Sequence, residues 1–164
     1  MVKLSQLIVD NDFRIMTGGI GDLPLAVYEG AKGSPRYTGN EIIAVLPGYD
    51  PDIAESYSDI QIATGLDIYR SIIVSNADAV VAVGGGAGTL LEIASAWAFK
   101  RPIFALKLEG WSGQLAGKRI DCRERYKNIT ADSVYSFEDP KLLVTSMVKM
   151  ISLYSKRHHG IPSL

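Results

Sequence analysis

The sequence has little cysteine and histidine, and it has no long apolar run. Its 164 residues include one cysteine, Cys122, and two histidines. A single cysteine excludes a disulfide within the chain and is typical of a reducing compartment. The absence of an apolar segment of membrane length and of a signal-peptide pattern leads us to expect a soluble, cytoplasmic protein.

An excess of charge of either sign is also absent. Lysine and arginine number 17 against 18 aspartates and glutamates, which gives a net charge of -1. This balance offers no electrostatic attraction for a nucleic acid polymer or an anionic membrane. Histidines, cysteine and carboxylates nowhere have the spacing of metal ligands, and His158 and His159 fall in a polar tail, so we predict no metal site.

Glycine, by contrast, is abundant, and the richest stretch runs from Ala77 to Lys100. Its first part, Ala77 to Val83, is a short valine-rich run that predicts a buried strand. Four glycines follow within five positions, and a dense apolar run from Thr89 predicts a helix. The next strand is expected over Ile103 to Leu106. Strand, glycine loop, helix and strand have the length of a βαβ crossover.

The rest of the chain also alternates between expected strands and helices. Further strands are expected over Phe13–Thr17, Ile42–Leu46, Ile60–Ala63 and Ser133–Phe137. Further helices are expected over residues 2–11, 22–31, 66–76 and 139–154, with Asp22 and Asp139 as caps and Ile68, Ile72 and Ile73 on one side of their helix. Tyr49 to Asp59 is expected to be a polar loop, and residues 108–125 give no clear pattern. We predict one domain over residues 1–164, with a Rossmann-like three-layer α/β/α sandwich around a mostly parallel sheet.

The glycine loops predict a site for a phosphate or another anion. The first N–H groups of a helix have no partner within the helix, and the helix dipole places positive charge there. Loops without side chains let an anion reach those groups. A tight turn that binds nothing is the alternative. The residues expected to bind are Thr17, Gly18, Gly19, Gly21, Gly84, Gly85, Gly86, Ala87, Gly88 and Thr89.

Two common nucleotide motifs are excluded by the residues present. A dinucleotide site needs a third glycine after Gly86 and Gly88, and a carboxylate after the next strand, where this chain has Lys107. A P-loop needs lysine followed by serine or threonine, which neither loop contains. We therefore predict that the protein requires no cofactor.

Two charged residues near the second loop admit both a structural and a functional interpretation. Thr89 and Glu92 have the spacing of a capping box, but Glu92 could instead face a ligand as a general base. Arg70, on the helix before the loop, is either part of a solvated face or a ligand for the anion.

The sequence Gly84-Gly85-Gly86-Ala87-Gly88-Thr89-Leu90-Leu91-Glu92 resembles the G-G-x-G-T-x-x-E signature of the LOG family, within the SLOG superfamily. Thr17 to Gly21 resembles the first glycine loop of that family, and Val45-Leu46-Pro47-Gly48 resembles its V-x-P-G strand end. Family members normally begin with a strand and a small loop before the first helix. We expect that strand to be missing from this chain.

The resemblance implies two functions of different classes. LOG proteins are phosphoribohydrolases that cleave cytokinin nucleoside 5′-monophosphates, and their catalytic glutamate and arginine map to Glu92 and Arg70. This chain has Val83 where LOG proteins have proline, and Ile68-Tyr69-Arg70-Ser71 where they have M-x-x-R-K. It is more similar to the branch with the molybdenum cofactor carrier proteins. That branch implies binding of a nucleotide or a molybdenum cofactor-like ligand without turnover.

The older label of the family, lysine decarboxylase-like, finds no support in these residues. A Schiff-base cofactor needs a lysine in the pocket, and neither glycine loop contains one. The expected partner is a phosphorylated small molecule. The helix Leu90 to Phe99 is more apolar than a surface helix requires, so we also expect a homodimer or a higher homo-oligomer.

Overall fold

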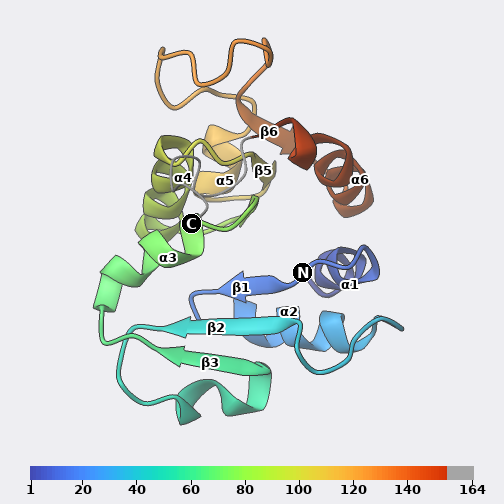
Figure 1. Ribbon diagram of the computed structural model, residues 1–164, viewed down its shortest axis with the longest axis vertical. Coiled ribbons are helices and arrows are strands. Elements are labelled where there is room, and N and C mark those ends of the chain that lie inside the picture. Colours follow the sequence, from blue (N-terminus) through green and yellow to red (C-terminus); the bar gives the residue numbers. More distant parts are fainter. Residues whose placement is uncertain (155–164) are drawn as a thin grey trace, which may run out of the picture. The chain divides into compact units, whose positions relative to one another are not determined.

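The computed structural model describes residues 1–154. The chain divides into two compact units, which are described separately. The first contains residues 1–74 and 140–144, and the second contains residues 75–139 with the described residues from 145 onward. Helices and parallel strands alternate in both units (Figure 1), so the predicted Rossmann-like α/β class is confirmed. A single domain over the whole chain stays a prediction.

The first unit contains a three-stranded parallel sheet in the order β1-β2-β3. Its strands are β1 (Ile15–Thr17), β2 (Ile42–Leu46) and β3 (Ile60–Ala63), with Ile15 opposite Ile42 and Ile43 opposite Ile60. Its helices are α1 (Val2–Asp10) and α2 (Leu23–Lys32). Val9, Val27, Ala31 and Ile42 form a buried cluster between these helices and the central strand. The apolar helical spacing in the sequence is thus realised as a packed face.

A carboxylate fixes the turn that leads into β2. Glu41 accepts hydrogen bonds from the N–H groups of Thr38, Gly39 and Asn40 and from the Thr38 hydroxyl. The Thr38 hydroxyl is the largest cause that lowers the pKa of Glu41 to about 2, and the backbone donors add to it. These bonds favour the charged carboxylate and hold the start of the central strand.

The second unit contains another three-stranded parallel sheet, in the order β4-β5-β6. Its strands are β4 (Val80–Val83), β5 (Ile103–Leu106) and β6 (Val134–Phe137). Its helices are α4 (Ala87–Ala98) and α5 (Trp111–Leu115), and α6 (Pro140–Met150) begins in the first unit and ends in the second. The central strand β5 is buried along its whole length. Ala82, Ile93, Ala96, Trp97, Ile103, Ala105 and Val134 form the core around it.

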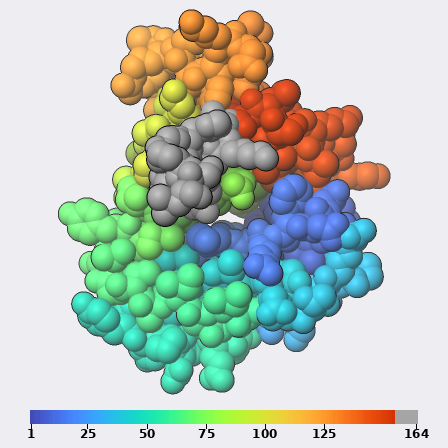
Figure 2. All heavy atoms as spheres, viewed as in Figure 1, coloured from blue at the N-terminus to red at the C-terminus, as the bar shows by residue number. Residues whose placement is uncertain are grey.

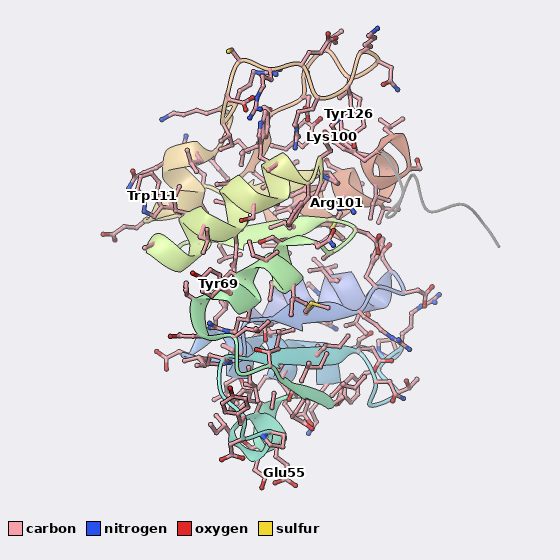
Figure 3. The ribbon with its side chains drawn as sticks, turned by 60° about the vertical axis from the view of Figure 1, so that its left-hand side comes forward. Glu55, Tyr69, Lys100, Arg101, Trp111 and Tyr126 are labelled. Carbon is pink, nitrogen blue, oxygen red and sulfur yellow. The ribbon has the colours of Figure 1, made fainter. Side chains whose placement is uncertain are left out.

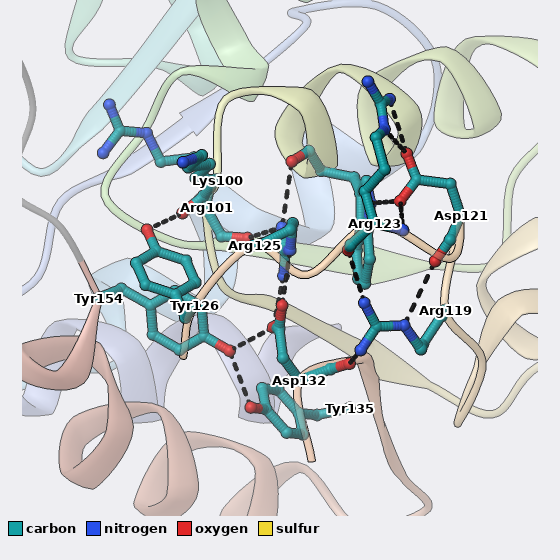
Figure 4. Close-up of polar contacts among 11 residues, drawn as sticks. Lys100, Arg101, Arg119, Asp121, Arg123, Arg125, Tyr126, Asp132, Tyr135 and Tyr154 are labelled. Carbon is teal, nitrogen blue, oxygen red and sulfur yellow. Dashed lines mark hydrogen bonds and ion pairs between the residues drawn. The ribbon is translucent and has the colours of Figure 1, made fainter. Parts of the chain in front are cut away.

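A buried ion pair organises the segment between α5 and β6. Arg125 donates its Nε and Nη2 protons to the carboxylate of Asp132, at 2.7 and 2.5 Å, and both side chains are at most 4% exposed. The guanidinium lies 3.6 Å from the centre of the Trp97 ring, and Tyr154 donates to Asp132 (Figure 4). Burial is the largest cause that raises the pKa of Tyr154. In Figure 2 the atoms of this segment, in orange, pack against one another as a compact protrusion.

Two predicted segments need correction. Tyr49 to Asp59 is not only a polar loop, because Asp52–Tyr57 forms a 3-10 helix (η1) that buries Ala54. Residues 66–76 form a 3-10 helix, Asp67–Arg70 (η2), followed by α3 (Ser71–Ser75). Ile68 lies in η2 and Ile72 lies in α3, so they are not part of one continuous helix, and they are 47% and 40% exposed.

The last predicted helix is also shorter than expected. It ends at Met150 and is followed by a 3-10 turn, Ile151–Leu153 (η3). His158 and His159 lie outside the described residues. Within residues 1–154, no helix is both long enough and apolar enough to cross a membrane.

Candidate functional site: two glycine loops

The glycine loop of the second unit connects β4 to α4 through two residues with positive φ. Gly84 and Gly85 have φ values of +59° and +87°. A Cβ atom at Gly85 would lie 1.9 Å from Oγ1 of Thr89, so the threonine side chain fills the space beside this glycine. The tight turn therefore requires glycine at position 85. Glycine tolerates the positive φ, and its missing side chain leaves room for the side chain of Thr89.

The capping box predicted for Thr89 and Glu92 is wrong. The helix begins two residues earlier, at Ala87, with Gly86 as its N-cap residue and no side-chain cap hydrogen bond. The positive-φ glycines complete the turn before Gly86, so Ala87 and Gly88 are already helical. Thr89 is the third helical residue, and its side chain lies against the loop rather than at the cap position.

The loop presents consecutive backbone N–H groups. In the part of the chain that the structure describes, the amides of Gly85, Gly86, Ala87, Gly88 and Thr89 have no hydrogen-bond acceptor. Gly85, Gly86 and Ala87 are exposed, so the first three of these donors lie at the surface, while Gly88 and Thr89 are partly buried. A helix of 12 residues follows and adds the partial positive charge of its dipole. Such an arrangement can hold an anion.

The carbonyl groups of the same loop are bonded to α5. The N–H groups of Trp111 and Ser112 donate to Gly85 and Gly84 at 3.0 Å each, and Gly84 N–H donates to Ser112 Oγ at 2.7 Å. Figure 3 shows Trp111 at the start of this helix. Helix α5 was not predicted from the sequence, because five residues give too short a window for helical periodicity. Glycines on either side of Trp111-Ser112 were the only signal.

Glu92 lies in the second turn of α4 and is partly buried. The third residue before it is Thr89, which contacts the loop, and the residue after it, Ile93, is fully buried in the core. The helix thus carries one carboxylate a single turn beyond the exposed amides.

The glycine loop of the first unit follows β1 and holds Arg70. Nε of Arg70 donates to the carbonyl of Gly18 at 3.0 Å, and Nη1 donates to the carbonyl of Asp67 at 3.1 Å. Arg70 is therefore not simply part of a solvated helix face. The structure thus brings together Gly18 and Arg70, two residues that the sequence singled out separately, within this unit.

Side chains on both sides of this loop fix its shape. Thr17 is buried, and its Oγ1 accepts a hydrogen bond from Gly19 N–H at 3.3 Å. Tyr57 of η1 donates to the carbonyl of Gly19 at 3.0 Å, a contact that was not predicted because the η1 segment was expected to be a loop. Gly21, with φ +91°, has open space around it. Over residues 1–154, no group of three or more His, Cys, Asp and Glu side chains has an arrangement that could hold a metal ion.

Comparisons with known proteins agree with this architecture. An uncharacterised protein of Archaeoglobus fulgidus is 35% identical over 106 residues, which are 64% of this chain and 67% of that protein. The crystal structure of the protein TM1055 has a TM-score of 0.70 at 24% identity, over 93% of this chain and 85% of that chain. The structure of the molybdenum cofactor binding protein of the phototrophic bacterium Rippkaea orientalis has a TM-score of 0.71 at 26% identity, over 92% of this chain and 85% of that chain.

A family model matches most of the chain. The model of the SLOG cluster4 family covers residues 1–143, which include both glycine loops, Arg70 and Glu92. On this match, the chain belongs to the SLOG cluster4 family.

Proposed function

We propose that this protein binds a phosphorylated small molecule, with the phosphate held by the loop Gly84 to Thr89. The observation that carries the proposal is the row of accessible, unbonded amides at the start of α4. Hydrogen bonds from amides to an ionised oxygen contribute about 1.5–3 kcal/mol each, so two or three of them suffice for specific binding.

The comparison with the Rippkaea orientalis protein supports ligand binding over other roles. That protein is described as a molybdenum cofactor binding protein, at 26% identity over 92% of this chain. We propose a ligand of the same chemical kind for this protein, a nucleotide or a molybdenum cofactor-like phosphate ester. The proposal also gives the first-unit loop, Thr17 to Gly21, a binding role in which Arg70 donates to an anion.

A nucleoside 5′-monophosphate phosphoribohydrolase is the second candidate function. It is favoured by the position of Glu92 one helical turn from the exposed amides, where a carboxylate can activate water. In this alternative Glu92 is catalytic, and free base is released from the monophosphate. A purely structural role leaves the exposed amides of the loop unexplained.

Titration with AMP tests the binding proposal. We expect AMP to bind, adenosine to bind at least tenfold more weakly, and Gly86→Ala to lower the affinity for AMP about tenfold. A Cβ atom at Gly86 has no neighbour within 4 Å, so the substitution leaves the fold in place and adds a methyl group beside the amides. A tenfold loss corresponds to about 1.4 kcal/mol. Calorimetric titration gives Kd, and thermal denaturation checks that Tm is retained.

The same experiment separates the two functions. Equal affinity for AMP and adenosine, or full AMP affinity in Gly86→Ala, contradicts phosphate binding at this loop. Release of adenine by the wild-type protein, lost in Glu92→Gln while AMP still binds, supports the hydrolase. AMP binding with no adenine released supports the carrier.

We also propose that the protein is a homo-oligomer through α4. Leu90 and Leu91 are partly exposed, and Phe99 at the end of the helix is 37% exposed, while the opposite side of α4 packs into the core. Sedimentation velocity at micromolar concentration is expected to give a dimer or a larger species. A monomer alone would contradict this proposal.

A further inference from the structure

The start of α5 determines which way the peptide groups of the phosphate-binding loop face. Trp111 N–H and Ser112 N–H hold the carbonyl oxygens of Gly85 and Gly84, each at 3.0 Å. The described chain has no cis peptide bonds, and in a planar trans peptide the N–H points opposite to the C=O. The two following amides, those of Gly86 and Gly85, therefore point away from α5.

This orientation is what the proposed site requires. The peptide between Gly84 and Gly85 and the peptide between Gly85 and Gly86 each have one end bonded to α5 and the other end free. If either peptide flipped, a carbonyl oxygen would take the place of an N–H group in the row of amides from Gly85 to Thr89. That oxygen would repel an anion. The two hydrogen bonds from α5 oppose such a flip.

Ser112 adds a side-chain link between two strand ends. Its hydroxyl donates to the carbonyl of Leu106, the last residue of β5, at 2.7 Å, and accepts from Gly84 N–H at 2.7 Å. Ser112 is completely buried, so no water competes for either bond. Leu106 pairs with Val83 across the sheet, so the hydroxyl ties the first residue of the loop to a rigid neighbouring strand.

We propose that Ser112 is a positioning residue for the phosphate site. It does not touch the ligand; through its hydroxyl and its N–H it holds Gly84 so that the amides of the next residues face the anion. This proposal rests on the proposed function, since it names the residue that sets the geometry of the same loop.

The test compares Ser112→Ala with Ser58→Ala. Ser58 is a buried serine of the first unit whose hydroxyl donates to the carbonyl of Ala54 at 2.7 Å, so it controls for the general cost of losing a buried hydroxyl. We expect Ser112→Ala to weaken binding of AMP and inorganic phosphate about tenfold and to speed hydrogen exchange at the Gly84 amide. Ser58→Ala should lower Tm but leave both Kd values unchanged.

A near-isosteric variant extends the test. Ser112→Cys keeps the shape of the side chain with a weaker donor and acceptor, so its affinity should lie between those of the wild type and Ser112→Ala. If Ser112→Ala does not fold, Ser112→Cys carries the comparison. If the wild-type protein binds AMP and inorganic phosphate, and the folded Ser112 variants bind them with the same affinity, Ser112 is not a positioning residue. That result does not contradict phosphate binding at the loop.

Failure of the underlying function gives a different result. If the wild-type protein binds neither AMP nor inorganic phosphate, phosphate binding is wrong, and exchange at Gly84 alone decides the role of Ser112. Unchanged exchange at this amide in Ser112→Ala then shows that the hydroxyl does not hold the loop. Faster exchange at Gly84, with unchanged exchange along β4, supports positioning of the loop.

Discussion

Replacing Asp132 with asparagine is expected to lower the free energy of unfolding by about 3–5 kcal/mol. The carboxylate of Asp132 is the charged partner of Arg125, and both side chains are at most 4% exposed. Without it, the guanidinium stays buried against Trp97 with no opposite charge. Removing the Arg125 guanidinium from water costs free energy. In the wild type the attraction to Asp132 offsets that cost, and in Asp132→Asn it does not. Chemical denaturation at neutral pH measures the effect.

An exposed ion pair provides the matched control for this prediction. Asp12 pairs with Arg36, and their side chains are 70% and 55% exposed. Asp12→Asn keeps a residue that tolerates the positive φ of this position, and it should cost less than about 1 kcal/mol. Replacing both buried partners, as Arg125→Met with Asp132→Leu, should recover most of the lost stability. If Asp132→Asn lowers the free energy of unfolding by less than about 1 kcal/mol, the buried Arg125–Asp132 pair does not have the expected effect on stability.

Replacing Gly110 with alanine is expected to cost about 2 kcal/mol or more of stability and to abolish phosphate binding. Gly110 has φ +102° and ψ -166°, a region that is essentially restricted to glycine, where strain costs about 1–3 kcal/mol. An added Cβ would also lie 2.6 Å from the carbonyl oxygen of Gly85 and 2.8 Å from the backbone of the same loop. The loop and α5 must then separate, which removes the hydrogen bonds that orient the amides.

The control for this prediction is Gly86→Ala, since that position has a negative φ and open space around it. It should retain the stability of the wild type within about 1 kcal/mol. Thermal denaturation compares the stability of both variants. AMP titration compares Gly110→Ala with the wild type, because Gly86→Ala is itself expected to lower the affinity for AMP. A Gly110→Ala protein with unchanged Tm and unchanged Kd would show that neither stability nor binding needs the close approach of Gly110 to the backbone of Gly84 and Gly85.

The sequence was sufficient where one local pattern determines the structure. The strands Ile42–Leu46 and Ile103–Leu106 have the predicted bounds, because each is a short apolar run that ends or begins beside a proline. Helices α1 and α2 follow apolar spacing at 3.6 residues per turn. Arg70 was singled out as a catalytic residue by the family resemblance, and its hydrogen bond to Gly18 was not predicted.

Other features depend on contacts that no local pattern records. The bond between Tyr57 and Gly19 joins residues 38 positions apart, and the bond between Ser112 and Gly84 joins residues 28 positions apart. Short elements such as η1 and α5 bury few side chains, so they leave almost no periodic signal. The true start of α4 depended on the φ angles of Gly84 and Gly85, which composition alone does not reveal.

The carbonyl contacts between α5 and the glycine loop have a consequence for the kinetics of recognition. Ordering a backbone residue costs about 1–2 kcal/mol in conformational entropy. For Gly84 and Gly85 this loss occurs when the polypeptide folds, because both carbonyls are already bonded to α5. An incoming ligand therefore meets a rigid receptor, and differences in affinity among ligands should arise mainly from how fast each one dissociates.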